Sequence, residues 1–259
     1  MENILLICIN LFSFFINGIT GFGATVLAQP TNIDILTLKV AIPFSTLISF
    51  PCLIYLGIRR FKNVDWKELG KIVVICAPGV FLGQYLAQIL DANVSKVVVG
   101  LFVSIIAIKG MIQVFFKKSS KKSEETENAD TLLLKIFRYS CLVIGGMLQG
   151  AYIIGGPLIT VYVLYAIKDK TVFRDTMNWF WIIVNVGFNF TSQFAQGMYE
   201  IPELWPITII GAISAFVGYL IGVKVHDKLS KELFLKITYV MLLLTGGNMF
   251  IQAANILLA

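Results

Sequence analysis

Two glycine-rich stretches interrupt apolar segments of this chain, namely Gly18-Ile19-Thr20-Gly21-Phe22-Gly23 and Gly150-Ala151-Tyr152-Ile153-Ile154-Gly155-Gly156-Pro157. A helix inside a lipid bilayer is costly to break, because each freed backbone N–H or C=O lacks water and costs several kcal/mol. Broken helices at membrane depth therefore persist where protein or a wet cavity covers them. Paired breaks at corresponding places in a chain indicate the binding site of a transporter.

The composition is that of an integral membrane protein. Of 259 residues, 57% are hydrophobic and 14% charged, against about 25% charged in soluble domains. Several apolar segments approach the roughly 20 residues that cross a bilayer. The segments are 3–28, 38–58, 72–90, 97–116, 136–167, 176–196, 204–223 and 232–258. We expect helices throughout, and hence an all-α protein that passes the cytoplasmic membrane several times. The net charge of +6 reports topology and does not indicate nucleic-acid binding.

No motif of an enzyme or a metal site is present in the sequence. There is no Walker loop and no Ser-His-Asp arrangement. The single histidine, His226, is expected in a charged loop. The four cysteines, Cys8, Cys52, Cys76 and Cys141, lie apart in apolar segments and are expected to be small buried hydrophobic residues. We therefore predict no catalytic residue, no metal and no cofactor.

The chain divides into two similar halves around one polar stretch, 117–130, which cannot bury apolar area. The predicted organisation is a membrane repeat over 1–116, a cytoplasmic linker over 117–134 and a second membrane repeat over 135–259. At an offset of 132 positions, Gly18 corresponds to Gly150 and Gly23 to Gly155. A three-residue adjustment then pairs Gly83 with Gly218. Internal repeats of this kind are frequent in transporters.

The distribution of positive charge favours a re-entrant hairpin. If all eight segments crossed the membrane, the loops on the two sides would carry eleven and nine lysines and arginines. Cytoplasmic loops should be enriched in these residues. If 136–167 enters and leaves on one side, the division becomes eighteen against Lys39 and Lys96. By symmetry 3–34 forms the matching hairpin. Each half is then one hairpin plus three spanning helices, and the repeats are inverted.

The two hairpin tips should meet near the middle of the membrane, where a second arm begins after Gly23 and after Gly156. A helix start offers free N–H groups and a partial positive charge, which together bind anions. The alternative is that these glycines only permit close helix packing. The predicted substrate-binding residues are Thr20, Gly21, Gly23, Ala24, Thr25, Lys39, Gln149, Tyr152, Gly155, Gly156, Pro157, Arg174 and Asn178.

Other polar residues of the apolar segments have two interpretations each. Asn17, Asn185 and Asn189 either coordinate an oxyanion or join helices. Lys39 and Arg174 each begin the helix after a hairpin and are expected to attract anions. Alternatively, Lys39 reaches to the membrane interface and Arg174 is an ordinary cytoplasmic charge. Apart from Glu232, the first residue of the last segment, the expected spanning segments contain no Asp or Glu, which argues against a proton relay through a buried carboxylate.

With these residues in view, the chain resembles the sulfite exporter TauE/SafE family over most of its length. The motifs that carry the resemblance are Gly18 to Gly23 leading to Pro30, Lys39-Val40-Ala41, Val64-Asp65-Trp66, Gly150 to Pro157 with Leu158-Ile159-Thr160-Val161-Tyr162, and Phe173-Arg174-Asp175-Thr176. The chain departs from the family pattern where Ile153, Ala24 and Thr25 replace glycines.

The resemblance implies a transporter of small anions that often contain sulfur, such as sulfite, sulfoacetate, thiosulfate or a similar organosulfonate. Two alternatives come from other classes, an anion channel and a membrane assembly factor that transports nothing. The expected partners are a small inorganic or organosulfur anion and the lipid bilayer, with a homodimer as a further candidate and no nucleic acid.

Overall fold

The structure is a computed structural model of the 259-residue chain. It describes residues 2–86, 101, 104–105, 107–108, 111–112, 132–153 and 155–258. Every regular element in this part of the chain is a helix. The expected span at 97–116 and the expected linker at 117–134 lie largely outside the described residues.

The first half contains α1 (Glu2–Thr20), α2 (Ala24–Arg60), the short 3₁₀ turn η1 (Phe61–Asn63) and α3 (Trp66–Leu86). A straight helix of 37 residues would measure about 55 Å, which is longer than a bilayer is thick. α2 is interrupted at Thr37, which has φ 66° and ψ 157°. We call 24–36 the first arm of α2 and 38–60 its second arm.

The second half begins with α6 (Leu132–Tyr152) and α7 (Gly156–Ala166). A continuous rod follows, made of α8 (Lys170–Trp181), the π-helical segment η2 (Ile182–Asn189) and α9 (Phe190–Ala195). Asp169 caps the start of this rod, because its Oδ1 accepts hydrogen bonds from the N–H groups of Thr171 and Val172 at 2.8 and 2.9 Å. The Val172 bond is the main cause of the lowered pKa of this carboxyl group. The turn η3 (Met198–Glu200), α10 (Leu204–Lys228) and α11 (Lys231–Leu258) complete the chain.

Both glycine-rich stretches interrupt the helices, as the sequence predicts. α1 ends at Thr20 and α2 begins at Ala24, while α6 ends at Tyr152 and α7 begins at Gly156. The arms fold back on each other in both cases. In the first hairpin, formed by α1 and the first arm of α2, Asn10 contacts Asn32. In the second, formed by α6 and α7, the rings of Tyr139 and Tyr162 lie 5.6 Å apart.

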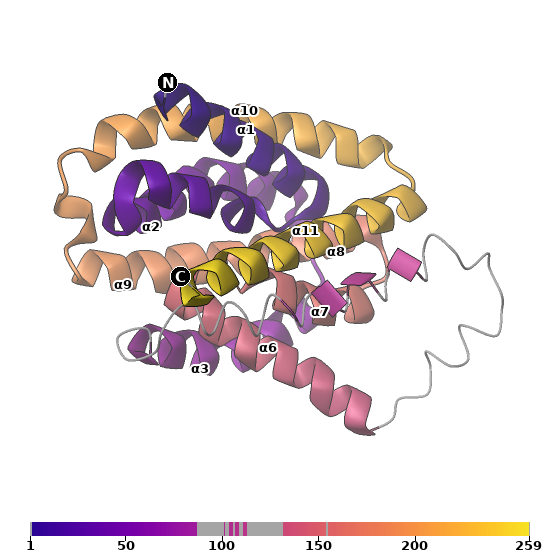
Figure 1. The fold of residues 1–259 in the computed structure, drawn as a ribbon. Coiled ribbons are helices and arrows are strands. Elements are labelled where there is room, and N and C mark those ends of the chain that lie inside the picture. Colours follow the sequence, from indigo (N-terminus) through magenta and orange to yellow (C-terminus); the bar gives the residue numbers. More distant parts are fainter. Residues whose placement is uncertain are drawn as a thin grey trace.

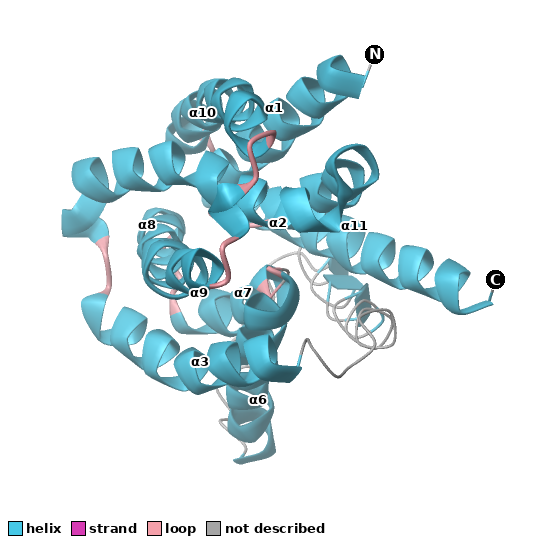
Figure 2. Ribbon diagram, turned by 90° about the vertical axis from the view of Figure 1, so that its left-hand side faces the viewer, coloured by secondary structure: helices cyan, strands magenta, loops and turns pink. Residues whose placement is uncertain are grey.

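The first arm of each hairpin packs along a helix from the other half of the chain. α1 lies beside α10 and α6 beside α3, with α2 and α8 between the two pairs (Figures 1 and 2). One cluster of buried side chains fills the space between α3, α6, α7 and α8, and a second fills the space between α1, α2 and α10. The first arm of each hairpin is therefore fixed by a helix from the other half of the chain, and each tip lies near the middle of the molecule.

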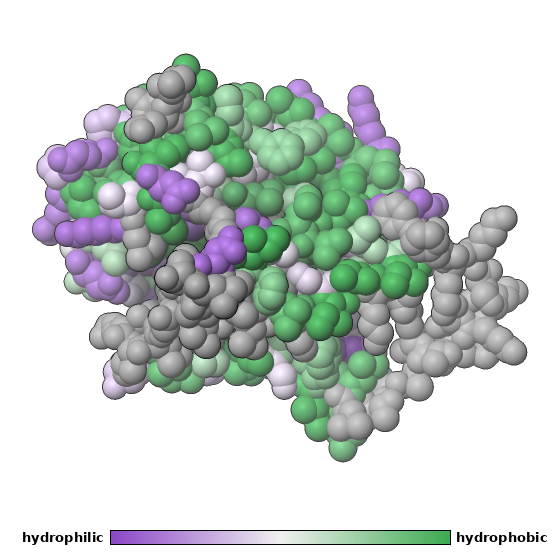
Figure 3. All heavy atoms as spheres, viewed as in Figure 1, coloured by the Kyte–Doolittle hydropathy of each residue, from purple (hydrophilic) through white to green (hydrophobic). Residues whose placement is uncertain are grey.

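Three helices among the described residues are long and apolar enough to cross a membrane: Lys39–Asn63, Trp66–Leu86 and Leu204–Lys228. The hairpin segments Ile4–Thr20 and Gly156–Ala166 are apolar but shorter. Large hydrophobic side chains such as Val74, Ile209 and Ile213 are exposed. Much of the face in Figure 3 is hydrophobic, and hydrophilic residues gather near its edges. A surface of this kind is suited to lipid contact.

Three expectations about polar residues and cysteines are wrong. His226 is not in a loop but buried in the last turn of α10, where its Nδ1 lies 2.6 Å from the carbonyl oxygen of Ile19. α8 begins several residues earlier than expected, so that a carboxylate, Asp175, is buried within it. Cys8 is exposed, whereas Cys52, Cys76 and Cys141 are buried as expected.

Candidate site between the hairpin tips

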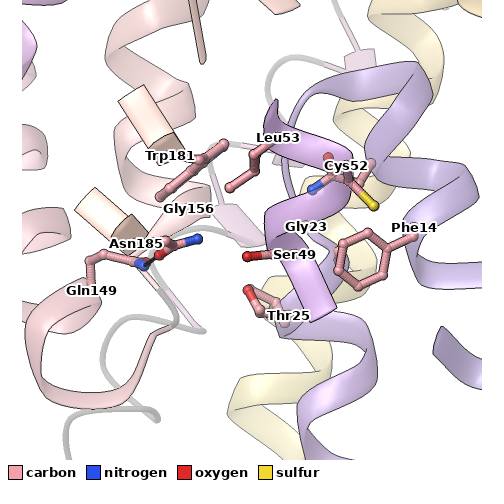
Figure 4. Close-up of a pocket in the computed structure, with 13 residues that line it drawn as sticks. Phe14, Gly23, Thr25, Ser49, Cys52, Leu53, Gln149, Gly156, Trp181 and Asn185 are labelled. Carbon is pink, nitrogen blue, oxygen red and sulfur yellow. Dashed lines mark hydrogen bonds between the residues drawn. The ribbon is translucent and has the colours of Figure 1, made fainter. Parts of the chain in front are cut away.

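A small cavity lies where the two hairpin tips meet, and residues from both halves of the chain line it (Figure 4). Its volume is about 30 Å³, room for about two water molecules. The lining residues are Phe14, Asn17, Gly23, Ala24, Thr25, Val26, Ser49, Cys52, Leu53, Gln149, Gly156, Trp181 and Asn185. None of these carries a formal charge, so any preference for ions must come from backbone and neutral polar groups.

The two tips are built from matching hydrogen bonds. The N–H of Gly21 donates to the Asn17 carbonyl at 2.7 Å, and the N–H of Ile153 donates to the Gln149 carbonyl at 3.1 Å. Gly21 has φ 82°, a left-handed conformation that glycine adopts without steric cost. Ile153 occupies the corresponding position with φ 60°, which is unusual for a β-branched residue.

The second arm of each hairpin starts at the cavity. Its first intrahelical bonds also correspond, from Leu27 N–H to the Gly23 carbonyl at 3.1 Å and from Ile159 N–H to the Gly155 carbonyl at 3.2 Å. The N–H groups that precede Leu27 have no intrahelical acceptor, as at any helix start. In the second hairpin Pro157 has no N–H, so this helix start offers fewer donors than the first.

Neutral polar side chains complete the lining of the cavity. Gln149 accepts a hydrogen bond from the Gly155 N–H at 3.1 Å and donates to Asn185 Oδ1 at 3.4 Å. Asn189 donates to the same Asn185 oxygen at 3.1 Å. Asn185 belongs to the π-helical segment, and such segments are frequent at functional sites. In Figure 4 the hydroxyl groups of Thr25 and Ser49 point toward Asn185 and Gln149 across the cavity.

Five of the predicted site residues line this cavity: Gly23, Ala24, Thr25, Gln149 and Gly156. Gly21, Thr20, Gly155 and Pro157 belong to the tips without lining it. Thr20 Oγ1 lies 2.9 Å from the carbonyl oxygens of Ile16 and Phe22 and so stabilises the first tip. A Cβ on Gly155 would collide with the Gly145 carbonyl. The side chain of Tyr152 lies outside the described part of the chain.

Three further predicted residues lie away from the cavity. Asn178 is buried, donates to the Leu53 carbonyl at 3.0 Å and accepts from the Tyr219 hydroxyl at 2.9 Å, so it joins α8 to α2 and α10. Lys39 is exposed at the start of the second arm of α2. Arg174 is completely buried.

A comparison with protein families supports the family resemblance that the sequence motifs of these tips carry. The profile of the sulfite exporter TauE/SafE family matches residues 6–249. The chain belongs to this family. No curated protein and no solved structure matches the chain significantly. TauE/SafE proteins are membrane anion transporters, and both hairpin tips of the present chain lie inside the matched region.

Arg174 of this TauE/SafE protein is buried at the first tip and forms an ionic cluster with the buried Asp175 and the exposed Asp227. Its Nη2 lies 2.9 Å from Asp175 Oδ1 and its Nη1 lies 3.5 Å from Asp227 Oδ1. Asn63 donates to the other oxygen of Asp175 at 3.1 Å. A Cβ on Gly21 would lie 3.2 Å from the Arg174 side chain. Arg174 is thus a packed residue of the tip with its charge compensated by two carboxylates.

Several lining residues were not among the predicted site residues. Phe14, Val26, Cys52, Leu53 and Trp181 are apolar or aromatic residues within apolar segments, and nothing in the sequence separates them from residues that face lipid. Ser49 offered a weak signal, because it is a hydroxyl residue in a membrane segment. Asn17 and Asn185 are polar residues of apolar segments with two interpretations in the sequence, and their places on the helices adjoining the tips are the signal that distinguishes them.

Proposed function

We propose that this protein carries a small oxyanion across the cytoplasmic membrane and binds it in the cavity between the hairpin tips. The observation that supports this most directly is the meeting of two helix starts, at Ala24 and Gly156, on one uncharged cavity. Each helix start contributes partial positive charge and free N–H groups. Inside a low-dielectric protein these dipoles act far more strongly than in water.

The side chains of the cavity suit a dehydrated anion. Thr25, Asn17 and Asn185 can supply O–H or N–H donors in place of water. Among the described residues that line the cavity there is no carboxylate to repel a negative charge, and no lysine or arginine that would hold it too tightly for release. The buried Asp175 is already paired with Arg174, so we propose no proton relay through the cavity itself.

The size of the cavity favours the smallest candidate substrates. A volume of about 30 Å³ corresponds to about two water molecules, so sulfite requires less expansion than thiosulfate, and sulfoacetate requires the most. We propose that sulfite or another compact inorganic oxyanion is preferred over extended organosulfonates.

We further propose that the halves 1–116 and 135–259 are inverted repeats, with eight membrane segments in all and the linker at 117–134 in the cytoplasm. Matching contacts support this. A Cβ on Gly79 would lie 2.6 Å from the Val143 carbonyl, and one on Gly83 would collide with that of Met147. In the other half, Cβ atoms on Gly218 and Gly222 would collide with the carbonyls of Leu11 and Phe15.

Glycines near the two tips show the same correspondence between the contacts of the two halves. A Cβ on Gly150 would collide with the Val80 carbonyl, and a Cβ on Gly18 would lie 2.5 Å from the Tyr219 carbonyl. An exchange of the two halves therefore converts the packing of α6 on α3 into that of α1 on α10. Such an exchange is what a pseudo-two-fold axis in the membrane plane would produce.

Flux measurements in liposomes test the proposed function against its alternatives. Purified protein should take up sulfite with saturation and should show counterflow, and sulfate, thiosulfate and sulfoacetate serve as competitors. An anion channel would pass ions without saturation or counterflow. An assembly factor would give no flux above that of protein-free liposomes. Either result would overturn the transporter proposal.

A further inference from the structure

We infer that the polar interior of the first hairpin is a passage for the substrate. It leads from the cavity, along the hairpin and away from its tip, to the membrane face at the open end of the hairpin. This inference rests on the proposed function, because it supplies the route to the proposed site. Three helical stretches enclose the passage: α1, the first arm of α2 and the second arm of α2. Each has one polar residue at the cavity, namely Asn17, Thr25 and Ser49 respectively.

From each of these residues a polar column continues away from the tip. Ser13 and Asn10 lie about one and two turns before Asn17 on α1. Residues four or seven positions apart share a helix face. On the first arm of α2, Gln29 and Asn32 follow Thr25 at the same spacings. On the second arm, Ser45 lies one turn before Ser49, and all three columns run in the same direction because the arms alternate in direction.

Hydrogen bonds show that the columns face one another. Asn10 Nδ2 donates to Asn32 Oδ1 at 2.9 Å, and the Ser45 hydroxyl donates to Gln29 Oε1 at 2.6 Å. Asn32 Nδ2 also lies 3.5 Å from Ser45 Oγ. These bonds join all three helical stretches and close the passage in this conformation.

The columns contain donors that the protein does not use. Gln29 is 4% exposed and its Nε2 has no hydrogen-bond partner. Ser13 is 0% exposed and its Oγ also has none. An amide nitrogen can only donate, so Gln29 requires an acceptor such as a water or an oxyanion. Buried polar groups in a membrane protein are normally satisfied. The two unpartnered atoms therefore indicate that a ligand or water occupies this space in another step of the transport cycle.

Helix association alone does not account for this polarity. Polar side chains can join membrane helices, but the polar residues of the columns in the first hairpin have apolar counterparts in the second, whose arms meet through Tyr139 and Tyr162 instead. At the offset of 132 that relates the two tips, Asn10 and Ser13 correspond to Leu142 and Gly145, and Gln29 and Asn32 to Val161 and Leu164. These columns of amide and hydroxyl side chains are present in the first hairpin, and their corresponding positions in the second hairpin are apolar. A passage on one side of the cavity explains that difference.

The passage would conduct a dehydrated oxyanion by successive exchange of neutral donors. Asn17 and Thr25 offer amide or hydroxyl hydrogens at the cavity, and Ser13 and Gln29 offer them about one helical turn, about 5.4 Å, farther along the columns. Neutral donors bind an anion strongly enough for entry and weakly enough for exit, a general requirement for conduction. Opening requires that the Asn10–Asn32 and Ser45–Gln29 bonds separate.

Cysteine accessibility tests this passage in full-length protein whose four native cysteines are replaced by serine or alanine. Ser13→Cys and Ser45→Cys are nearly isosteric changes inside the passage. Val163→Cys, on α7 of the apolar hairpin, is the control, because Val163 is as fully buried as Ser13. A small anionic methanethiosulfonate should modify the two passage variants at least about tenfold faster than the control. Passage variants that react no faster than Val163→Cys would overturn the inference.

Transport after modification supplies the second readout. The sulfonate left on Ser13→Cys should reduce sulfite flux at least about tenfold, whereas an uncharged methyl adduct should reduce it less. Reactive cysteines whose sulfonate adduct leaves flux unchanged would also overturn the passage. Absence of flux in the unmodified cysteine-free protein would instead count against the proposed function, provided that the wild-type protein also gives none.

A charge substitution gives an independent test that needs no reagent. Gln29→Glu keeps the oxygen that accepts from Ser45 and removes an Nε2 that has no partner. It should reduce sulfite flux about tenfold or more by repulsion. Gln196→Glu adds the same charge at an exposed position at the end of α9 and should leave flux unchanged. Equal flux in the two variants, both eluting as folded protein, would contradict the passage.

Discussion

The indole Nε1 of Trp181 donates a 2.8 Å hydrogen bond to the carbonyl oxygen of Gly21, across 160 positions of sequence. The same ring borders the cavity and lies 3.6 Å from the position that a Cβ on Gly156 would occupy. One side chain of α8 thus holds the first tip and also contacts the start of the second arm of the second hairpin. Movement of either tip should be transmitted to the other through this ring.

Trp181→Phe should therefore reduce both stability and transport. The change leaves the Gly21 carbonyl without its donor in a buried place, which costs about 1–3 kcal/mol of the free energy of unfolding. Trp179→Phe is the matched control, because Trp179 donates to the Gly57 carbonyl at 3.3 Å and does not line the cavity. Thermal unfolding in detergent should show losses in both variants, and sulfite flux should fall only in Trp181→Phe. Equal flux in both would contradict the role of this ring.

The neighbouring glycines of the second tip should respond differently to substitution. A Cβ on Gly156 would meet, among the described residues, only Trp181, at 3.6 Å, and Gly156 lines the cavity. Gly156→Ala should fold normally, and the added methyl group should weaken sulfite binding. Gly155→Ala should instead lower the free energy of unfolding by about 1–3 kcal/mol, because its Cβ collides with the Gly145 carbonyl. Binding by calorimetry and thermal unfolding separate the two effects, and a Gly156→Ala variant with unchanged affinity would count against the site.

The positions of the two helix breaks were predictable from the sequence. Unpaired backbone groups have a high free-energy cost in lipid, so such breaks are rare, and they occur at glycine and proline residues that are easily recognised. Glycine at Gly21 and Gly23 and proline at Pro157 have local conformational signatures. The family assignment followed from the same residues, and the profile match over 6–249 confirms it.

Features that depend on distant contacts were not predictable. Arg174 is neutralised partly by Asp227, which follows it by more than fifty positions and whose approach depends on the packing of α10. The pairing of the two halves by sequence also differs locally from the pairing by contacts. The sequence pairs Gly83 with Gly218, whereas matching contacts pair Gly79 with Gly218 and Gly83 with Gly222, one helical turn away. Apolar helices with glycines at four-residue intervals align almost equally well in either register.

Removal of the buried guanidinium group should destabilise the protein strongly. Arg174→Ala leaves Asp175 buried without its partner, and loss of one member of a buried ion pair costs about 3–5 kcal/mol. Arg60→Ala is the control, because Arg60 pairs with the same Asp227 from a partly exposed position and its loss should cost about 0–1 kcal/mol. Arg174→Met combined with Asp175→Asn should recover part of the stability. Weakened anion affinity with unchanged thermal stability in Arg174→Ala would instead support a role in attracting anions.

Glycine should relieve backbone strain at the bend within α2, and only when it replaces Thr37. Thr37 is exposed and adopts φ 66° and ψ 157°, a region that is nearly restricted to glycine and costs other residues about 1–3 kcal/mol. Thr37→Gly should therefore raise the free energy of unfolding by about 1 kcal/mol after the entropic cost of glycine is subtracted. Thr31→Gly makes the same chemical change in the helical first arm and should lower it by up to about 1 kcal/mol. Opposite shifts of the unfolding midpoint are thus expected. If both variants lose stability, Thr37 carries no strain, and the bend between the first and second arms of α2 must be imposed by tertiary packing alone.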